Sequence, residues 1–161
     1  MPEQGLVAVF DIDGVVADVR HRLHHVNRRP KNWAAFFAAA DRDPPLAEGI
    51  ALAKEYAQTH ALVWLTGRPE RLRRVTERWL ADNDLPTEVL FMRPNNDRRP
   101  SRDFKSAQLR AIGAQGEIAV IVDDDPEVVA RLKENGWPAR LATWVPYEEP
   151  LRQAQEGEGR T

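Results

Sequence analysis

The sequence predicts an α/β protein, a three-layer sandwich in which helices cover both faces of a central parallel sheet. Short uninterrupted apolar runs recur along the chain, as is typical of strands that are buried on both faces. Segments with helical periodicity separate these runs, and strand–helix–strand repetition favours a parallel sheet with right-handed connections. At 161 residues, the chain has the length of one domain.

Four apolar runs are the clearest strand candidates. None shows the polar alternation of a half-exposed strand, so each is expected in the interior of the sheet. A fifth candidate mixes polar with apolar residues and is weaker. The four runs cover residues 6–10, 61–65, 89–92 and 118–122, and the fifth covers residues 139–144.

Helices are expected between these strands. Residues 71–82 carry apolar side chains at helical spacing, with arginines and glutamates on the opposite face. Asp125 before Pro126 is typical of a helix N-cap, and Asn135-Gly136 is typical of a helix end. The expected helices cover residues 46–58, 71–82 and 104–112, and a fourth runs from residue 126 to the Asn135-Gly136 pair.

Composition excludes several function classes. The chain has no cysteine, which rules out disulfides, thiolate zinc sites and a cysteine nucleophile. The first apolar run, residues 6–10, is too short for a signal peptide or a membrane span. We therefore expect a cytoplasmic protein without membrane attachment. The net charge of −2 does not favour nucleic acid as such, but basic residues are concentrated in segments 20–31 and 93–105.

The chain is expected to form one domain, residues 1–146. Residues 19–45 form a small flap or cap insertion within it, and residues 147–161 are expected to be a polar, flexible tail. Between residues 66 and 105 there is room for only a helix, a strand and a loop. Because neither insertion can hold a sizeable lid, the site should be open enough to admit a bulky substrate.

Acids and small polar residues follow three of the strands. Because the carboxyl ends of parallel strands meet at one edge of a sheet, these side chains should lie together. Several carboxylates in a confined space require a cation, and ligation by oxygen alone selects Mg²⁺. The segments are Asp11-Ile12-Asp13-Gly14 after the first strand, Thr66-Gly67 after the second, and Asp123-Asp124 after the fourth.

Each of these signals is weaker alone than in combination. An Asp-x-Asp pair also occurs in calcium loops, but here Val15 takes the next ligand position. Thr66-Gly67 alone could simply be a turn, and Lys105 alone could be a surface lysine. Asp125 is assigned to the helix cap. The histidines at positions 21, 24 and 25 have no matching cluster of zinc ligands.

In this order, the four motifs resemble those of the haloacid dehalogenase (HAD) superfamily of phosphatases over residues 6–144. The resemblance implies that Asp11 forms an aspartyl-phosphate and that Asp13 acts as general acid and then base. It implies that Thr66 and Lys105 hold the phosphoryl group. Mg²⁺ would be held by Asp11, the backbone carbonyl of Asp13, and an acid of the Asp123-Asp124 pair, with Asp124 favoured.

More narrowly, the chain is similar to the 3′-phosphatase domain of phage polynucleotide kinase/phosphatase. The similarity rests on Arg22, on Arg68 directly after Thr66-Gly67, and on Asp97-x-Arg99 before Lys105. It implies that Arg22 and Arg68 contact the substrate phosphate or its neighbour. Arg99 and Gly67 are further candidates for substrate binding. The chain departs from that domain at Thr66, where the phage domain has serine, and at Asp125, where it has arginine. The chain has no phosphate-binding loop of kinase type.

Three functions follow as hypotheses. The first is a phosphatase for nucleic-acid 3′-ends or nucleotides, with a kinase or ligase as a possible separate partner. The second keeps the chemistry but takes a small phosphorylated metabolite. The third is a non-catalytic module that binds phosphate or nucleic acid. Oligomeric state is not indicated by the sequence.

Overall fold

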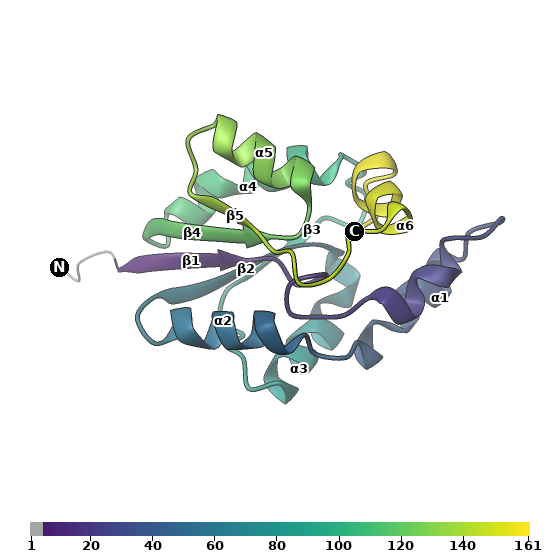
Figure 1. Cartoon of the computed structure of the whole chain (residues 1–161), viewed down its shortest axis with the longest axis horizontal. Coiled ribbons are helices and arrows are strands. Elements are labelled where there is room, and N and C mark those ends of the chain that lie inside the picture. The colour runs from purple at the N-terminus through teal and green to yellow at the C-terminus, as the bar shows by residue number, and fades with distance from the viewer. Residues whose placement is uncertain (1–4) are drawn as a thin grey trace.

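The computed structural model describes residues 5–161, which form a five-stranded sheet with helices on both faces (Figure 1). All neighbouring strands are parallel, in the order β3-β2-β1-β4-β5. The predicted α/β class is therefore confirmed. The strands are β1 (Leu6–Phe10), β2 (Ala61–Pro69), β3 (Leu90–Arg93), β4 (Glu117–Asp123) and β5 (Ala139–Leu141).

Helices cover both faces of the sheet (Figure 1). On one face lie α2 (Ala47–Ala57) and α3 (Arg73–Asp82), and on the other lie α4 (Ser101–Gly113) and α5 (Pro126–Glu134). Helix α4 begins three residues earlier than predicted, which places Lys105 in its second turn. Asp125 caps α5 as expected, since its Oδ1 accepts a hydrogen bond from the Glu127 N–H at 2.9 Å.

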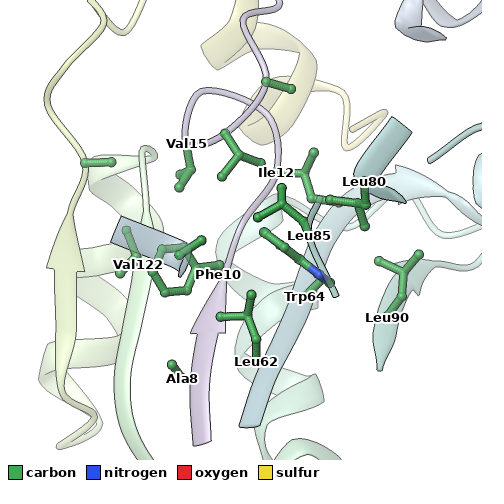
Figure 2. Packing of buried hydrophobic residues seen from close by; sticks show 14 of the residues in the cluster. Ala8, Phe10, Ile12, Val15, Leu62, Trp64, Leu80, Leu85, Leu90 and Val122 are labelled. Atoms are coloured by element: carbon green, nitrogen blue, oxygen red, sulfur yellow. The ribbon is translucent and has the colours of Figure 1, made fainter. Parts of the chain in front are cut away.

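Alternation along β1 divides the core into two layers. Ala8 and Phe10 face α2 and α3, where they pack with Trp64 and Leu80 (Figure 2). The intervening valines of β1 face α4 and α5. Because residues two apart on a strand point to the same face, continuous apolar runs serve both layers. This burial fixes the strand ends that carry the predicted site.

The flap forms a third, smaller apolar cluster. It contains the 3₁₀ helices η1 (Arg20–His25) and η2 (Ala40–Arg42), with helix α1 (Trp33–Ala38) between them. Phe36 and Phe37 of α1 are buried against Leu23. The flap thus has a core of its own beside the carboxyl ends of the strands.

The C-terminal segment is helical where the sequence predicts a flexible tail. Helix α6 (Glu149–Arg152) leads into a π-helical turn, Gln153–Gly157. Leu151 is 4% exposed because it packs into the flap cluster, and Ala154 is also buried. These two apolar residues are three positions apart, a spacing typical of one helix face. Because the rest of the segment is polar, this helical pattern is easily overlooked in the sequence. Within residues 5–161, no helix is both long and apolar enough to cross a bilayer.

Candidate active site

A tight turn after β1 places Asp11 at the edge of the sheet. The Asp11 N–H donates to the Val122 carbonyl at 2.9 Å, and the Ile12 carbonyl accepts from the N–H groups of residues 15, 16 and 17. Gly14 has a φ of +76°, and a Cβ there would lie 1.9 Å from Asp124 Oδ2. Glycine at this position therefore permits both the turn and the approach of Asp124.

Asp11, Asp123 and Asp124 form a buried acid cluster. Each offers a carboxylate oxygen, and the three oxygens lie within 4.8 Å of one another. Burial, together with the neighbouring carboxylate of Asp123, raises the pKa of Asp11 to about 8. Burial and the charges of Asp11 and Asp123 also raise the pKa of Asp124 well above its usual value. The cluster therefore requires positive charge to ionise fully.

Lys105 supplies part of that positive charge. Its Nζ lies 2.5 Å from Asp123 Oδ2 and 3.2 Å from Asp11 Oδ2. Although burial opposes the charged form, the carboxylates of Asp11 and Asp123 outweigh it and raise the pKa of Lys105. The structure thus brings together the lysine and the acids that the sequence predicts to meet.

The remaining cluster oxygens suit a hard cation. Asp11 Oδ1 accepts from the Ile12 N–H at 2.7 Å, but Asp11 Oδ2 and Asp124 Oδ1 have no hydrogen-bond donor within residues 5–161. Asp123, by contrast, accepts from Lys105 and from the Asp125 N–H. Buried carboxylate oxygens that accept no hydrogen bond, with no nitrogen or sulfur ligand beside them, fit Mg²⁺.

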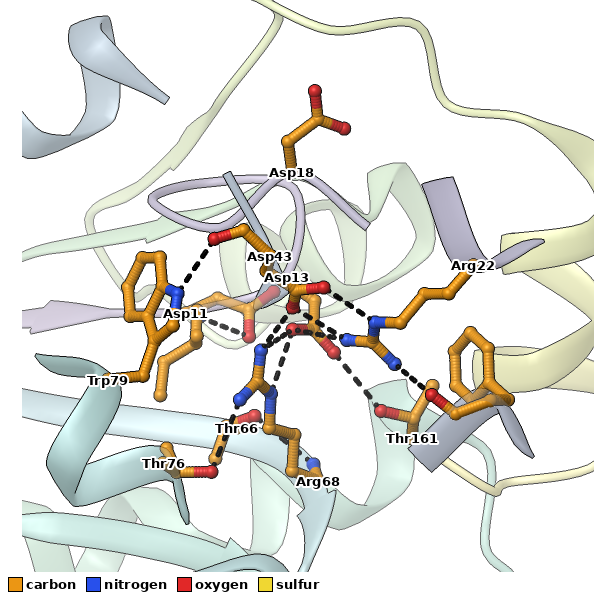
Figure 3. Close-up of polar contacts among 12 residues, drawn as sticks. Asp11, Asp13, Asp18, Arg22, Asp43, Thr66, Arg68, Thr76, Trp79 and Thr161 are labelled. Atoms are coloured by element: carbon orange, nitrogen blue, oxygen red, sulfur yellow. Dashed lines mark hydrogen bonds and ion pairs between the residues drawn. The ribbon is translucent and has the colours of Figure 1, made fainter. Parts of the chain in front are cut away.

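The Asp13 carboxylate lies apart from this cluster, between two arginines (Figure 3). Arg68 Nη2 is 2.7 Å from Asp13 Oδ1, and Arg22 Nη2 is 3.4 Å from the same oxygen. Burial alone would raise the pKa of Asp13, but the charges of Arg68 and Arg22 outweigh it and lower that pKa. Two carboxyls two residues apart thus have opposite environments.

The guanidinium groups of Arg22 and Arg68 are buried and paired with carboxylates. Each is 1% exposed, and both contact Asp43, a buried acid of the flap that the sequence analysis missed. Arg68 also donates to Thr76 Oγ1 at 3.2 Å. In this structure both arginines contact Asp13 and Asp43. That they also contact the substrate directly stays a prediction.

Thr66 and Gly67 lie beside the chain's last residue. Thr66 is buried, and its Oγ1 accepts from the Arg68 N–H at 3.1 Å. A Cβ on Gly67 would lie 2.2 Å from the carbonyl carbon of Thr161, and Thr161 Oγ1 donates to Asp13 Oδ2 at 3.2 Å. The C-terminal segment therefore covers the part of the site that the sequence assigns to phosphate.

Arg99 lies away from these residues. Its guanidinium pairs with Asp97 at 2.7 Å and is about half exposed. Among the residues that the structure describes, no hydrogen bond or ion pair joins the Arg99 side chain to the acid cluster. Arg93 is instead the buried arginine of this loop, donating to the Gly67 carbonyl at 3.0 Å and to the Arg99 carbonyl at 2.7 Å.

Sequence comparison decides the family. The sequence model of the polynucleotide kinase PNKP phosphatase domain matches residues 6–140 of this chain. The chain belongs to that family. It is a phosphatase of the HAD superfamily, and the non-catalytic hypothesis is set aside. No curated protein shows significant sequence similarity to the chain.

Solved structures share the PNKP-phosphatase fold. A chain in the structure of the Pnkp1/Rnl/Hen1 RNA repair complex superimposes with a TM-score of 0.71 at 24% identity, over 89% of this chain. The class C acid phosphatase from Bacillus anthracis with tungstate bound superimposes with a TM-score of 0.67 at 13% identity, over 95% of this chain and 71% of its own. This chain covers only 44% of the RNA-repair chain, so it corresponds to less than half of that protein.

The PNKP-phosphatase site contains three residues that sequence reasoning did not assign to it: Asp43, Arg93 and Thr161. Arg93 could have been recognised, because it directly follows the apolar run 89–92 and is the last residue of β3, at the edge where the other site residues lie. Asp43 and Thr161 follow no strand. They reach the site only through the folding of the flap and of the C-terminal segment.

Proposed function

We propose that this phosphatase removes phosphate from nucleic-acid 3′-ends or nucleotides through an aspartyl-phosphate on Asp11. The observation that carries the proposal is Oδ2 of Asp11, which accepts no hydrogen bond within residues 5–161, lies 3.2 Å from the Lys105 Nζ, and is close to the Asp124 carboxylate. A nucleophilic oxygen that is buried next to a cation and a potential metal site suits phosphoryl transfer. Membership in the PNKP phosphatase-domain family supports a polynucleotide substrate.

The acid cluster is the proposed magnesium site. Asp11, Asp124 and the backbone carbonyl of Asp13 would hold the ion. Asp123 is the less suitable direct ligand, because its two oxygens already accept from Lys105 and the Asp125 N–H. When bound, Mg²⁺ neutralises the carboxylates and the phosphoryl oxygens.

In the first step, Asp11 Oδ2 forms a bond to phosphorus, and the bond from phosphorus to the leaving oxygen breaks. The Ile12 N–H holds the other Asp11 oxygen and so fixes the direction of attack. Lys105 and the Thr66 hydroxyl are proposed to bind the transferred phosphoryl oxygens. Asp13 gives its proton to the leaving oxygen, which departs as an alcohol.

Asp13 must carry a proton for that step, although Arg68 and Arg22 lower its pKa in the free protein. A phosphate group entering near the two arginines offsets their positive charge and adds negative charge beside Asp13. Both effects raise the pKa of Asp13. Substrate binding is therefore proposed to favour the acid form when it is needed.

In the second step, Asp13 takes a proton from water, and the water oxygen forms a bond to phosphorus. The bond between phosphorus and Asp11 Oδ2 breaks, which releases inorganic phosphate and restores the Asp11 carboxylate. Asp13 is ionised at the start of this step. Arg68 and Arg22 favour that ionised form once the leaving alcohol has gone.

Kinase and ligase activities are proposed to come from outside residues 1–161. The sequence holds no Gly-x-x-x-x-Gly-Lys loop, and the chain covers less than half of the RNA-repair chains it resembles. A nucleic acid with a 3′-phosphate cannot be joined until that phosphate is removed. Ligation is therefore the class of reaction that would use the product.

The test is phosphate release with Mg²⁺ from a panel of 3′-phosphorylated oligonucleotides, 3′-mononucleotides and sugar phosphates. We expect kcat/KM to be highest for the oligonucleotides and to fall as salt rises, because a polymer releases counterions on binding. A large preference for sugar phosphates would favour the small-metabolite hypothesis and overturn the polynucleotide assignment.

A further inference from the structure

Asp43 joins the two buried arginines of the site. Its Oδ1 accepts from Arg22 Nε at 2.8 Å, and its Oδ2 accepts from Arg22 Nη2 at 3.0 Å and from Arg68 Nη2 at 2.8 Å (Figure 3). His21 Nε2 lies 2.6 Å from Oδ1. The flap and the end of β2 thus meet at one carboxylate.

The position of Asp43 is fixed from a third element. The indole N–H of Trp79, on α3, donates to the Asp43 backbone carbonyl at 2.8 Å. Trp79 is itself buried in the main core. The Asp43 backbone is therefore tied to the main core even though Asp43 belongs to the flap.

Charge balance explains why a second acid is present. Arg22 and Arg68 bring two buried positive charges to Asp13, which carries one negative charge, and Asp43 supplies the other. Removing one member of a buried ionic group leaves a charge without compensation, at a large cost in free energy. With Asp43 present, each guanidinium bridges two carboxylates in a planar, directional arrangement.

We propose that Asp43 is a positioning residue that acts through Arg22 and Arg68 to orient Asp13 toward the leaving oxygen. This inference rests on the proposed function. Asp43 does not meet the substrate in this scheme, because its side chain is fully buried and its negative charge would repel phosphate. Arg68 is the direct link, since Nε donates to Asp13 at 2.9 Å while Nη2 donates to Asp43.

Such a role has a specific kinetic signature. Asp13 matters most when the leaving oxygen is a poor leaving group that must be protonated as its bond to phosphorus breaks. A nitrophenolate leaves without that proton. Misplacing Asp13 should therefore slow phosphoryl transfer to Asp11 from an alkyl phosphate much more than from a nitrophenyl phosphate, whereas a loss of folded enzyme lowers both rates equally.

The experiment compares Asp43→Asn with wild type on p-nitrophenyl phosphate and on a 3′-phosphorylated oligonucleotide, with folded protein quantified by circular dichroism. Asp41→Asn is the matched control, an exposed acid two residues away. We expect Asp43→Asn to lower kcat/KM for the oligonucleotide by about tenfold or more and kcat/KM for the aryl ester by less than about threefold, because kcat/KM reports phosphoryl transfer to Asp11 and not hydrolysis of the shared aspartyl-phosphate. The oligonucleotide KM should change little.

Equal losses on both esters, or no loss, would overturn the positioning role. If Asp43→Asn does not fold, Asp43→Glu keeps the charge and moves the carboxylate by one methylene, and it must show the same unequal loss. The Asp13→Asn variant is the reference, because it shows how much the losses on the two esters differ when the general acid itself is removed. Wild-type protein that hydrolyses neither ester would instead refute the proposed function, and this inference with it.

Discussion

The carboxylate of Asp124 occupies the space that a side chain on Gly14 would need. The two residues come from different strand ends, and a Cβ on Gly14 would lie 1.9 Å from Asp124 Oδ2. The loop after β1 and the loop after β4 are therefore packed together without room for a methyl group. This contact brings the acids of both loops within reach of one cation.

Gly14→Ala should displace Asp124 and lower kcat/KM by on the order of 100-fold, because misplacing a group by about 1 Å has effects of that size. The measurement is steady-state hydrolysis of p-nitrophenyl phosphate at several Mg²⁺ concentrations. Gly136→Ala is the matched control, since Gly136 has a φ of +84° but no heavy atom within 4 Å of its Cβ position. Equal losses in the two variants would mean that backbone strain, and not the contact with Asp124, limits the site.

Mg²⁺ should stabilise the protein more at pH 8.5 than at pH 6. The pKa of Asp11 in the metal-free fold is raised from 3.8 to about 8, so the folded state binds a proton that the unfolded chain releases. Metal-free stability should then fall as pH rises from about 4 to about 8, while deprotonation makes the ligands available to the ion. The measurement is the increase in Tm on replacing chelator with 5–10 mM Mg²⁺. We expect this increase to be on the order of a few degrees at pH 8.5.

Asp11→Asn provides the control for that pH dependence, because it removes the titrating nucleophile while keeping its shape. The Mg²⁺-induced increase in Tm should become smaller and less dependent on pH. An increase that is the same at pH 6 and pH 8.5 in the wild-type protein would contradict the acid cluster as the metal site.

Loosening the C-terminal segment should improve access to the site. Glu156 anchors this segment to α4, since it accepts a hydrogen bond from Arg102 Nη1 at 2.6 Å. At the end of the segment, Thr161 donates a hydrogen bond to Asp13. Glu156→Ala should therefore lower the KM for a 3′-phosphorylated oligonucleotide by about two- to fivefold, the size expected for a coupling near 1 kcal/mol. Glu149→Ala, on the exposed side of α6, is the control.

An unchanged or higher KM in Glu156→Ala would show that the segment does not compete with substrate. In that case the contact between Thr161 and Asp13 would be compatible with bound phosphate. Stopped-flow binding of a non-hydrolysable oligonucleotide analogue to both variants would separate access from chemistry.

The sheet and the acid cluster could be predicted because their signals are local. Asp11, Thr66 and Asp123 directly follow apolar runs in the sequence, and parallel strands bring such positions to one edge. Lys105 is harder to place, since it lies on a helix and does not follow a strand, but the order of the motifs predicted that it would lie near the acids. Its contact with Asp123 agrees with that expectation.

The second half of the site depends on contacts between distant segments, which no local pattern encodes. Asp43 reaches Arg68 across the flap, and its surroundings in the sequence, Asp41-Arg42-Asp43-Pro44, look like a solvent-exposed turn. The folded C-terminal segment was missed for a similar reason. Leu151 packs in a cluster whose other buried members are flap residues, more than a hundred residues earlier in the chain.

The most direct test of the account is chemical trapping of the phosphorylated enzyme. Enzyme mixed with substrate and Mg²⁺ is quenched in acid, reduced with borohydride and analysed by peptide mass spectrometry, since reduction converts an aspartyl-phosphate to homoserine. We expect homoserine at position 11, and none in Asp11→Asn, which should also lack turnover. Active enzyme without modification at position 11, or turnover that persists in Asp11→Asn, would contradict the role of Asp11 as nucleophile.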